Sequence, residues 1–214
     1  PCEGNIMVSN PFWCKTVSEY KNETKRWIEA PDMQNYMDLA IFFDSFAVAG
    51  DKDLLINLKD DLFNKLHDKD VFMAYFAKAT LTFDTPNTIA NFMTKSHNID
   101  IKKAAVFPIV QGIRSLALRE KIRETTTVKR IKILEEKKIL ERSKAAELLE
   151  AFDVVNTLRL KAQLDDIQDN KEVNNEIDTH TLGKIERDLL KDSFKIVIEF
   201  KKFINYTFRI DKIS

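Results

Sequence analysis

Apolar and polar residues follow the period of an α-helix along most of this chain. The clearest example is residues 143–170, which we predict to form one long helix. On a helical wheel its apolar residues fall into two arcs, which we expect to pack against neighbouring helices. Ala151, Phe152, Val155 and Leu158 form the first arc, and Leu149, Leu160, Leu164 and Ile167 form the second. The predicted solvent face holds Glu150, Thr157, Lys161 and Gln168.

Three polar residues of this helix, Asn156, Arg159 and Gln163, fall between the two apolar arcs. Their position predicts that they point toward partner helices and not toward solvent. A guanidinium on a packed surface is costly unless it is paired or left open to a ligand. Arg159 is therefore a candidate ligand-binding residue, with Asn156 and Gln163 beside it.

Capping and chain-breaking residues predict where the other helices begin and end. Thr16 and Glu19 have the spacing of a capping box, which opens a helix that extends to about residue 29. Residues 34–49 are apolar on almost every side, and Gly50 is expected to end that helix at the C′ position. Asp51 is expected to cap the next helix, residues 52–66. The remaining predicted helices begin at Asp68 or Asp70, at Phe107, at Thr125 to Thr127 and at Thr181, and end near residues 81, 122, 138 and 206.

The predicted fold class is therefore all-α, a helical bundle of about eight helices. Residues 88–105 alternate too weakly to predict strands. Ile6 to Val8 form a short apolar run among turn residues, which indicates one short N-terminal strand. Because the chain opens with Pro1 inside such a segment, we interpret it as a piece of a longer protein.

Composition and charge exclude several classes of function. Lysine plus arginine and aspartate plus glutamate both number 34, so no overall field favours nucleic acid or a membrane surface. The apolar runs are too short to span a bilayer. Two cysteines, Cys2 and Cys14, provide no disulfide framework and favour a reducing, cytoplasmic location.

Motifs for metal binding and catalysis are weak. The three histidines, His67, His97 and His180, are scattered without ligand spacing, so we predict no metal site. Asp51 and Asp53 are spaced like the Asp-x-Asp pair that holds magnesium in nucleotidyl transfer, but no strand precedes them. We interpret them as a helix cap with a dipole-favoured carboxylate, and we predict no catalytic residue.

Two other charged residues fall on apolar helix faces. Asp44 lies on the apolar helix 34–49, and Arg114 lies beside Val110, Ala117 and Leu118. One buried carboxylate and two buried arginines, Arg114 and Arg159, allow two interpretations. They form a structural ion-pair network, or they line a cleft that binds an anionic ligand through the arginines.

Several strings of residues, in this order and spacing, carry a resemblance to a known family. They are Ile41 to Asp44, Ala47 to Asp51, Asp100 to Lys103, Pro108 to Val110, Thr125 to Thr127, Leu158 to Lys161, Gln163 with Leu164, and Leu182 with Glu186 and Arg187. They resemble the helical domain known as the putative nucleotidyltransferase substrate-binding domain. The opening segment, Gly4 to Pro11 with Trp13, resembles the end of the catalytic domain that precedes it. Family members usually have an arginine where this chain has Ser45 and Phe46, and commonly a histidine where it has Ala162.

The resemblance implies a role beside a catalytic domain, in proteins related to PII uridylyltransferase and glutamine synthetase adenylyltransferase. Residues 1–15 would be the trailing segment of that nucleotidyltransferase domain, and residues 16–214 the helical substrate-binding domain. The helical domain would bind nucleotide or an acceptor protein, using Arg159, Gln163, Arg114, Asp44 and Asn156. The resemblance implies no cofactor in this fragment, and Mg²⁺ with a nucleoside triphosphate for the parent protein. Cyclic-nucleotide-binding and CBS domains are implied upstream.

A second function remains open from the sequence. The chain is alternatively a non-catalytic helical module that dimerises or docks sensor domains through an apolar helix face, in a signalling protein. The two functions differ in whether Asn156, Arg159 and Gln163 open to a cleft or are sealed by partner helices.

Overall fold

The structure is a computed structural model that describes residues 10–86 and 98–213. These residues hold eight α-helices, which confirms the predicted all-α bundle. They are α1 (Val17–Glu29), α2 (Met33–Phe43), α3 (Lys52–Lys65), α4 (Asp70–Lys78), α6 (Phe107–Arg119), α7 (Thr127–Glu136), α8 (Arg142–Gln168) and α9 (Lys184–Phe208). The predicted strand at Ile6 to Val8 lies outside the described residues.

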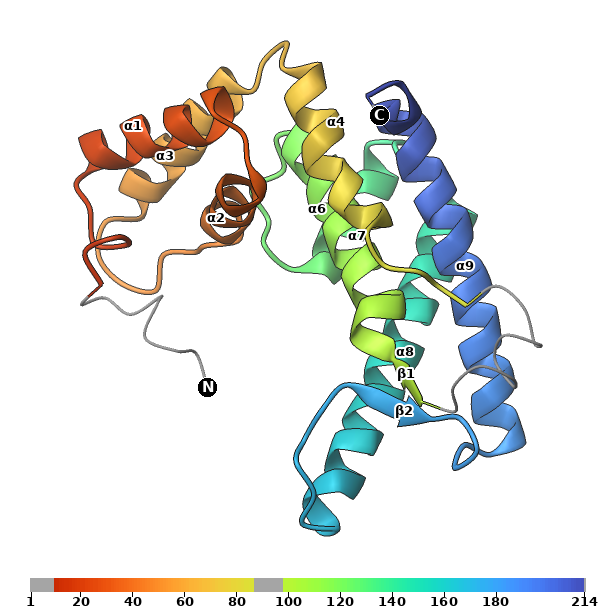
Figure 1. Cartoon of the computed structure of the whole chain (residues 1–214). Helices are drawn as coiled ribbons and strands as arrows, with labels where there is room; N and C mark the ends of the chain where they lie inside the picture. Colours follow the sequence, from red (N-terminus) through yellow and green to blue (C-terminus); the bar gives the residue numbers. More distant parts are fainter. Residues whose placement is uncertain (1–9, 87–97, 214) are drawn as a thin grey trace.

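The helices are arranged in two groups (Figure 1). Helices α1 to α3 form a small group at one side, and α4 and α6 to α9 form the main bundle. The long helices α8 and α9 pack along each other in opposite directions, and the C-terminal end of α8 projects beyond the rest. One hydrophobic core runs through both groups, from Trp27 and Leu39 to Ile113, Val155 and Ile204.

A two-stranded sheet crosses the lower part of α8. Strand β1 (Asn98–Asp100) pairs antiparallel with β2 (Glu176–Asp178), with Ile99 opposite Ile177. The sequence did not indicate either strand, because each has only three residues and such short segments carry little periodicity. After β1 the chain forms a widened helical turn, Lys102–Val106, that continues directly into α6. Helix α6 begins at Phe107 with Pro108 in its first turn, as predicted, whereas the widened turn that leads into it was not predicted.

The predicted helix 34–49 is too long. Helix α2 ends at Phe43, and the hydroxyl of Ser45 donates to the Phe42 carbonyl at 2.6 Å. Gly50 has a positive φ of 81°, but it lies in the following loop and not at the C′ position. Tertiary contacts made by Asp44 and Ser45 hold this segment out of the helix. Asp51 caps α3 as predicted, through a 2.9 Å bond from the Asp53 amide.

The last helix begins later than predicted. Gly183 and not Thr181 is its N-cap residue, and the Glu186 carboxylate accepts the Gly183 amide at 2.8 Å. The Thr181 hydroxyl instead donates to the Asp178 carbonyl at 2.8 Å, in the turn that leaves β2. The capping box at Thr16 and Glu19 is confirmed.

One apolar arc of α8 packs and the other largely does not. Ala151, Val155 and Leu158 are buried, as predicted. In the second arc Leu160, Leu164 and Ile167 are 57%, 48% and 58% exposed, so the expectation that this arc is packed is wrong. Its residues lie toward the projecting end of α8, which reaches past the main bundle.

Gly112 sets the distance between α6 and α9. A Cβ atom there would lie 2.5 Å from Cε1 and 2.8 Å from Cζ of Phe200, which is buried. We predict that Gly112→Ala lowers the free energy of unfolding by about 1 to 3 kcal/mol, because overpacking outweighs the helix-propensity gain of alanine. Denaturant unfolding measures this change.

A matched control is Gly183→Ala, where the nearest side-chain atom to the added Cβ is 3.6 Å away. Both substitutions restrict the unfolded chain in the same way. Alanine is disfavoured at the N-cap position of Gly183 and favoured inside α6, so without a clash Gly112→Ala would be the more stable of the two variants. Adding Phe200→Leu to Gly112→Ala should recover part of the loss. A Gly112→Ala variant at least as stable as the native chain would contradict the close packing.

Candidate functional site

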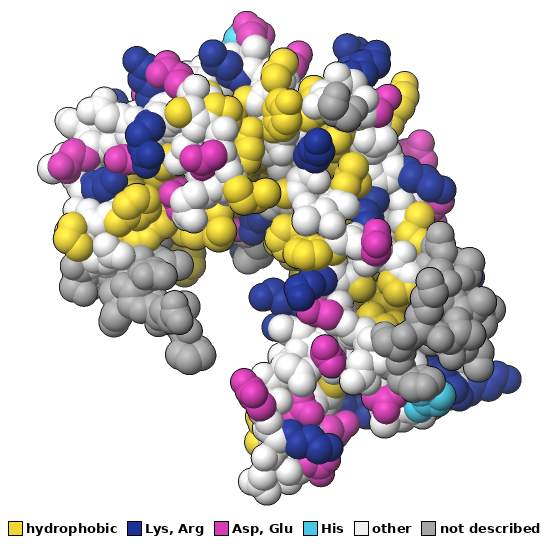
Figure 2. Space-filling model, in the orientation of Figure 1, with side chains coloured by type: hydrophobic (Ala, Val, Ile, Leu, Met, Phe, Trp, Pro, Cys, Tyr) yellow, Lys and Arg dark blue, Asp and Glu magenta, His cyan; other side chains and the backbone are white. Residues whose placement is uncertain are grey.

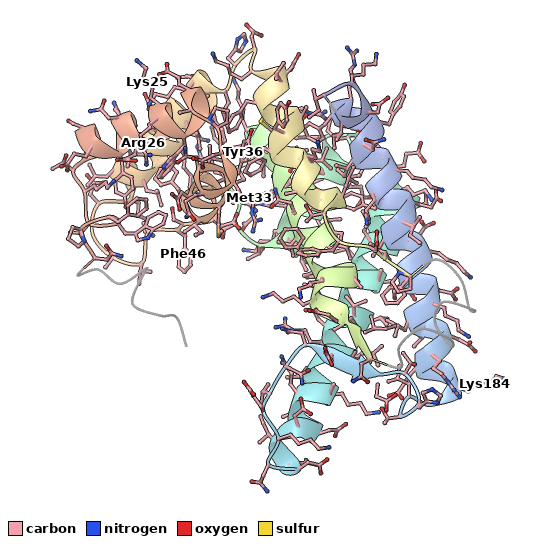
Figure 3. All side chains as sticks on the ribbon, viewed as in Figure 1. Lys25, Arg26, Met33, Tyr36, Phe46 and Lys184 are labelled. Atoms are coloured by element: carbon pink, nitrogen blue, oxygen red, sulfur yellow. The ribbon has the colours of Figure 1, made fainter. Side chains whose placement is uncertain are left out.

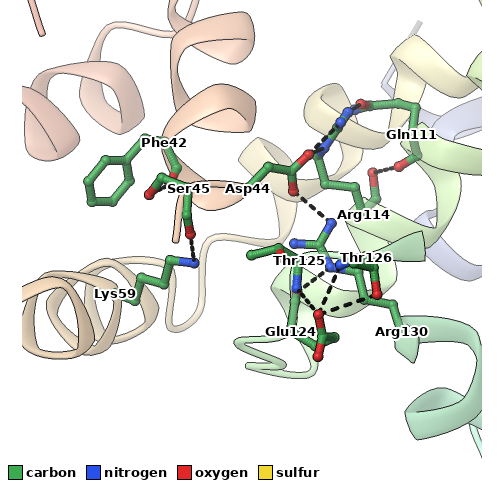
Figure 4. Close-up of polar contacts among 11 residues, drawn as sticks. Phe42, Asp44, Ser45, Lys59, Gln111, Arg114, Glu124, Thr125, Thr126 and Arg130 are labelled. Carbon is green, nitrogen blue, oxygen red and sulfur yellow. Dashed lines mark hydrogen bonds and ion pairs between the residues drawn. The ribbon is translucent and has the colours of Figure 1, made fainter. Parts of the chain in front are cut away.

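Asp44 lies where the end of α2 meets α6 and α7, and two arginines bind its carboxylate (Figure 4). Arg114 of α6 donates from Nε at 2.9 Å and from Nη2 at 2.6 Å to Oδ2. Arg130 of α7 donates from Nη1 to Oδ1 at 2.7 Å. The structure therefore brings together two of the predicted site residues, Asp44 and Arg114, and adds Arg130. The side chains of Asp44 and Arg114 keep 28% and 16% of their surface exposed, whereas that of Arg130 keeps 1%.

Further hydrogen bonds fix the two arginines. Arg114 Nη1 donates to Gln111 Oε1 at 2.5 Å, and Gln111 Nε2 donates to the Phe76 carbonyl at 3.0 Å. Arg130 Nε donates to the Glu124 carbonyl at 2.5 Å. The Arg130 guanidinium lies 4.5 Å from the centre of the Phe43 ring, in cation–π geometry. Arg130 Nη2 is buried and has no hydrogen-bond partner among the described residues.

Glu124 organises the turn between α6 and α7. Its carboxylate accepts the amides of Thr125 at 2.7 Å and Thr126 at 3.0 Å. These bonds, with that from Thr126 the strongest influence and the charge of Lys129 a further one, lower the pKa of Glu124 to about 2. Glu124 is therefore a second carboxylate that stays ionised near Arg130.

Lys59 of α3 adds a third cation, which is buried like Arg130. Its Nζ donates to the Ser45 carbonyl at 2.7 Å, and only 3% of the residue is exposed. Burial lowers its pKa to about 8, and the nearby charge of Arg130 acts in the same direction. We name Asp44, Lys59, Arg114, Glu124 and Arg130 the Asp44 cluster. Its three cations and two carboxylates hold the loop after α2 against α3, α6 and α7.

The three predicted polar residues of α8 lie elsewhere, against the chain that leads into β2. Arg159 Nε donates to Asn175 Oδ1 at 2.7 Å, and Gln163 Nε2 donates to the Asn174 carbonyl at 3.1 Å. Asn156 bonds within its own helix, to the Phe152 carbonyl at 2.7 Å. All three are partly buried. Within residues 10–86 and 98–213, no carboxylate lies within ion-pairing distance of Arg159, so its charge has no counter-ion there.

The structure thus separates the predicted site residues into two places. The ion pairing of Asp44 and Arg114 fits the structural network that the sequence left open, and a ligand role for Arg114 stays a prediction. Three members of the cluster, Lys59, Glu124 and Arg130, were missed, although the spacing of two of them gave a signal. Arg130 precedes Leu134 by one helical turn, and Lys59 lies one turn before Leu62 and Phe63 on a buried face.

Comparison with known proteins identifies the class of the chain. Residues 70–208, more than half of the chain, match the family described as "Putative nucleotidyltransferase substrate binding domain". Residues 1–34 match a second family, described as a putative nucleotidyltransferase. The chain therefore belongs to the nucleotidyltransferase substrate-binding domain family, and a nucleotidyltransferase domain is its partner in that family architecture. No curated protein and no solved structure matches the chain.

Among residues 10–86 and 98–213, no three histidine, cysteine, aspartate or glutamate side chains gather closely enough to hold a metal ion. None of the helices in the same residues has the length and apolar character needed to cross a membrane.

Asp44→Asn tests the structural weight of the Asp44 cluster. The substitution leaves the buried Arg130 without its counter-ion, so we predict a loss of about 2 to 4 kcal/mol in the free energy of unfolding, slightly less than for a fully buried pair. Asp60→Asn is the matched control, because Asp60 pairs with Arg123 at an exposed position. That variant should lose less than about 1 kcal/mol. Equal losses in urea unfolding would contradict the assignment.

Lys59 predicts a pH dependence of stability. Above pH 8 the folded state releases the Lys59 proton, whereas the unfolded chain keeps it until about pH 10.5. The unfolded state then binds more protons, so this residue makes the free energy of unfolding rise between those two pH values. We predict that the stability of the native chain relative to Lys59→Met rises by about 2 to 3 kcal/mol across that window.

The control for Lys59→Met is Lys52→Met, which removes an exposed ammonium from the same helix. Its stability relative to the native chain should stay constant over the same window. A constant difference for Lys59→Met as well would show that the Lys59 ammonium remains charged in the folded state at high pH.

Proposed function

We propose that this chain is the substrate-binding portion of a uridylyltransferase-like nucleotidyltransferase, and that Arg159 binds an anionic group of the nucleotide or of an acceptor protein. The observation that carries the proposal is the state of Arg159. This guanidinium is partly buried on α8, its Nε is oriented by a neutral amide, and its charge has no counter-ion among the described residues. Such a group is suited to bind phosphate or carboxylate, because guanidinium presents several donors in a fixed plane.

The bonds around Arg159 support preorganisation. Asn175 Oδ1 accepts the hydrogen bond from Arg159 Nε, so the planar guanidinium, with its donors on Nη1 and Nη2, is held in one orientation. Gln163, one helical turn after Arg159, donates to the carbonyl of Asn174, the residue before Asn175. A clamp that is oriented before the substrate arrives loses less conformational freedom on binding. In this proposal Gln163 and Asn156 flank the clamp, and Arg114 takes part only if a substrate anion replaces Asp44.

The shape of the molecule also supports a partner domain. Figure 2 shows a deep hollow between α1–α3 and the projecting end of α8. Phe46, in the loop after α2, points toward the hollow side and is 69% exposed (Figure 3). Exposed apolar side chains at such a surface favour contact with another domain. In the proposed protein the nucleotidyltransferase domain lies against this side.

The chemistry of transfer would belong to the partner domain. There, metal-bound carboxylates with Mg²⁺ and a nucleoside triphosphate would drive in-line displacement, while residues of this chain hold the substrate in position. Cyclic-nucleotide-binding and CBS domains upstream, and a cytoplasmic location, are further parts of the proposal. The match to the substrate-binding family does not favour the alternative of a non-catalytic interaction module.

Thermal unfolding of the chain with ATP, UTP, CTP or GTP, with and without Mg²⁺, tests the proposal. A nucleotide bound only to the folded state at about one hundred times its dissociation constant stabilises by about 2.7 kcal/mol. For a chain of this size that raises the midpoint by a few degrees. We predict a rise with at least one nucleotide and its loss in Arg159→Ala.

Lys161→Ala is the matched control, since Lys161 lies on the same helix and pairs with Glu186 at an exposed position. It should keep the rise seen with the native chain. If no nucleotide changes the unfolding midpoint of the native chain, Arg159 is not part of a nucleotide site. The same conclusion follows if Lys161→Ala loses the rise as fully as Arg159→Ala does.

A further inference from the structure

A cavity of about 550 Å³ lies between the start of α8 and the C-terminal half of α9. Its floor is apolar, and its rim carries charges of both signs. The floor is formed by Ile139, Leu140, Leu148, Ile196, Phe200 and Phe203. This volume falls within the range of about 300 to 1,000 Å³ that small-molecule sites usually have. The cavity is separate from the Asp44 cluster and from Arg159, since it shares no lining residue with either.

The charges at the rim decide which kind of ligand fits. Lys144 pairs with Glu147 at 3.1 Å, and Lys202 pairs with Glu199 at 2.8 Å. These two pairs neutralise themselves at exposed positions. Lys202, through its hydrogen bond and charge, also lowers the pKa of Glu199, so that carboxylate stays ionised.

Two rim charges remain, those of Lys138 and Glu141. Glu141 is the N-cap residue of α8, where a negative charge is already favoured by the helix dipole. Lys138 is exposed in the turn before α8, and no carboxylate among the described residues pairs with it. A ligand that enters the cavity can therefore gain most by placing a negative charge at Lys138.

The apolar floor completes the recognition. Phe200 is buried and its ring packs closely against Gly112 of α6. Tyr206 stands at the mouth with 84% of its surface exposed, although burial of aromatic surface is favourable. A bounded cavity of this size suits one small molecule, whereas a docked protein would need an interface of about 1,000 Å² or more.

We infer that this cavity binds a small amphipathic anion, with an apolar body on the Phe200 floor and a carboxylate, sulfonate or phosphate at Lys138. Such a ligand buries the exposed face of Tyr206 and pairs the unpaired lysine at once. The site lies on α8 and α9, the two helices that also carry the longest packing surface of the bundle.

The test uses the fluorescence of 8-anilinonaphthalene-1-sulfonate, an aromatic anion, with the whole chain. Saturable binding should be displaced by decanoate and not by decyltrimethylammonium or decanol. Lys138→Glu should weaken binding about fivefold or more. Lys137→Glu makes the same change of charge at the exposed neighbouring residue outside the cavity, and it should weaken binding less than about twofold.

Ile196→Trp fills the cavity from a partly exposed position and should abolish binding. Its circular dichroism and thermal unfolding show whether the fold is retained, and Phe203→Ala provides a second change of the floor if it is not. Equal displacement by the cation, equal effects of the two lysine variants, or unchanged binding in both floor variants would each overturn the inference. Nucleotide-induced stabilisation should be the same in Lys138→Glu as in the native chain, since the two sites share no residue.

Discussion

The carboxylate of Asp44 joins the two groups of helices through partly buried ion pairs, whereas the pair of Asp60 and Arg123 joins them at an exposed position. Asp44 lies at the end of α2, and its partners come from α6 and α7. The same loop is held by Lys59 of α3 through the Ser45 carbonyl. Apolar contacts also join the two groups: the ring centre of Tyr36 in α2 lies 5.3 Å from the ring centre of Phe72 in α4. Helices α1 to α3 therefore keep their position relative to the main bundle through a small number of specific contacts.

A charged junction has a particular energetic consequence. Burying charges is costly, so an ion pair of this kind adds little net stability compared with a well-packed apolar contact. Removing one partner, however, strongly lowers the free energy of unfolding, because the remaining charge stays buried without a counter-ion. The junction therefore favours one arrangement of the two groups over others, in which Arg130 would lie desolvated without Asp44. Its Nη2 has no hydrogen-bond partner in the part of the chain that the structure describes, so within those residues the observed arrangement leaves one donor unsatisfied.

Most of the helical fold could be predicted from the sequence, because helix periodicity and capping are local properties. Thr16 and Glu19 predict the start of α1, and Asp51 predicts the start of α3, each through a contact with a residue no more than three positions away. The end of α2 could not be predicted in this way. The sequence is apolar again from Phe46 to Ala49, which favoured a longer helix. The helix stops at Phe43 because Arg114, Arg130 and Lys59 bind Asp44 and Ser45 from distant parts of the chain. The strands were missed for a similar reason, since β1 and β2 are stable only as a pair.

The candidate site shows the same limit. A helical wheel indicated that Asp44, Arg114 and Arg159 are not ordinary solvent-exposed charges, and all three are partly buried. The wheel could not state which of them meet. Asp44 and Arg114 are neutralised together, whereas Arg159 faces the amide of Asn175. Whether a buried arginine is structural or available to a ligand depends on its counter-ion, and counter-ions come from elements far away in sequence.

This separation bears on how the domain would work beside a catalytic domain. A charge that is already paired can bind substrate only by breaking a contact that holds the fold, so substrate binding at Arg114 would loosen the junction of the two helix groups. Binding at Arg159 carries no such cost, because Asn175 orients the guanidinium without neutralising it. The neutralised arginines can then keep the hollow beside α1–α3 in a fixed shape, while the uncompensated one remains free to respond to a ligand. If Arg159 binds substrate as proposed, stability and recognition fall to different arginines of one chain.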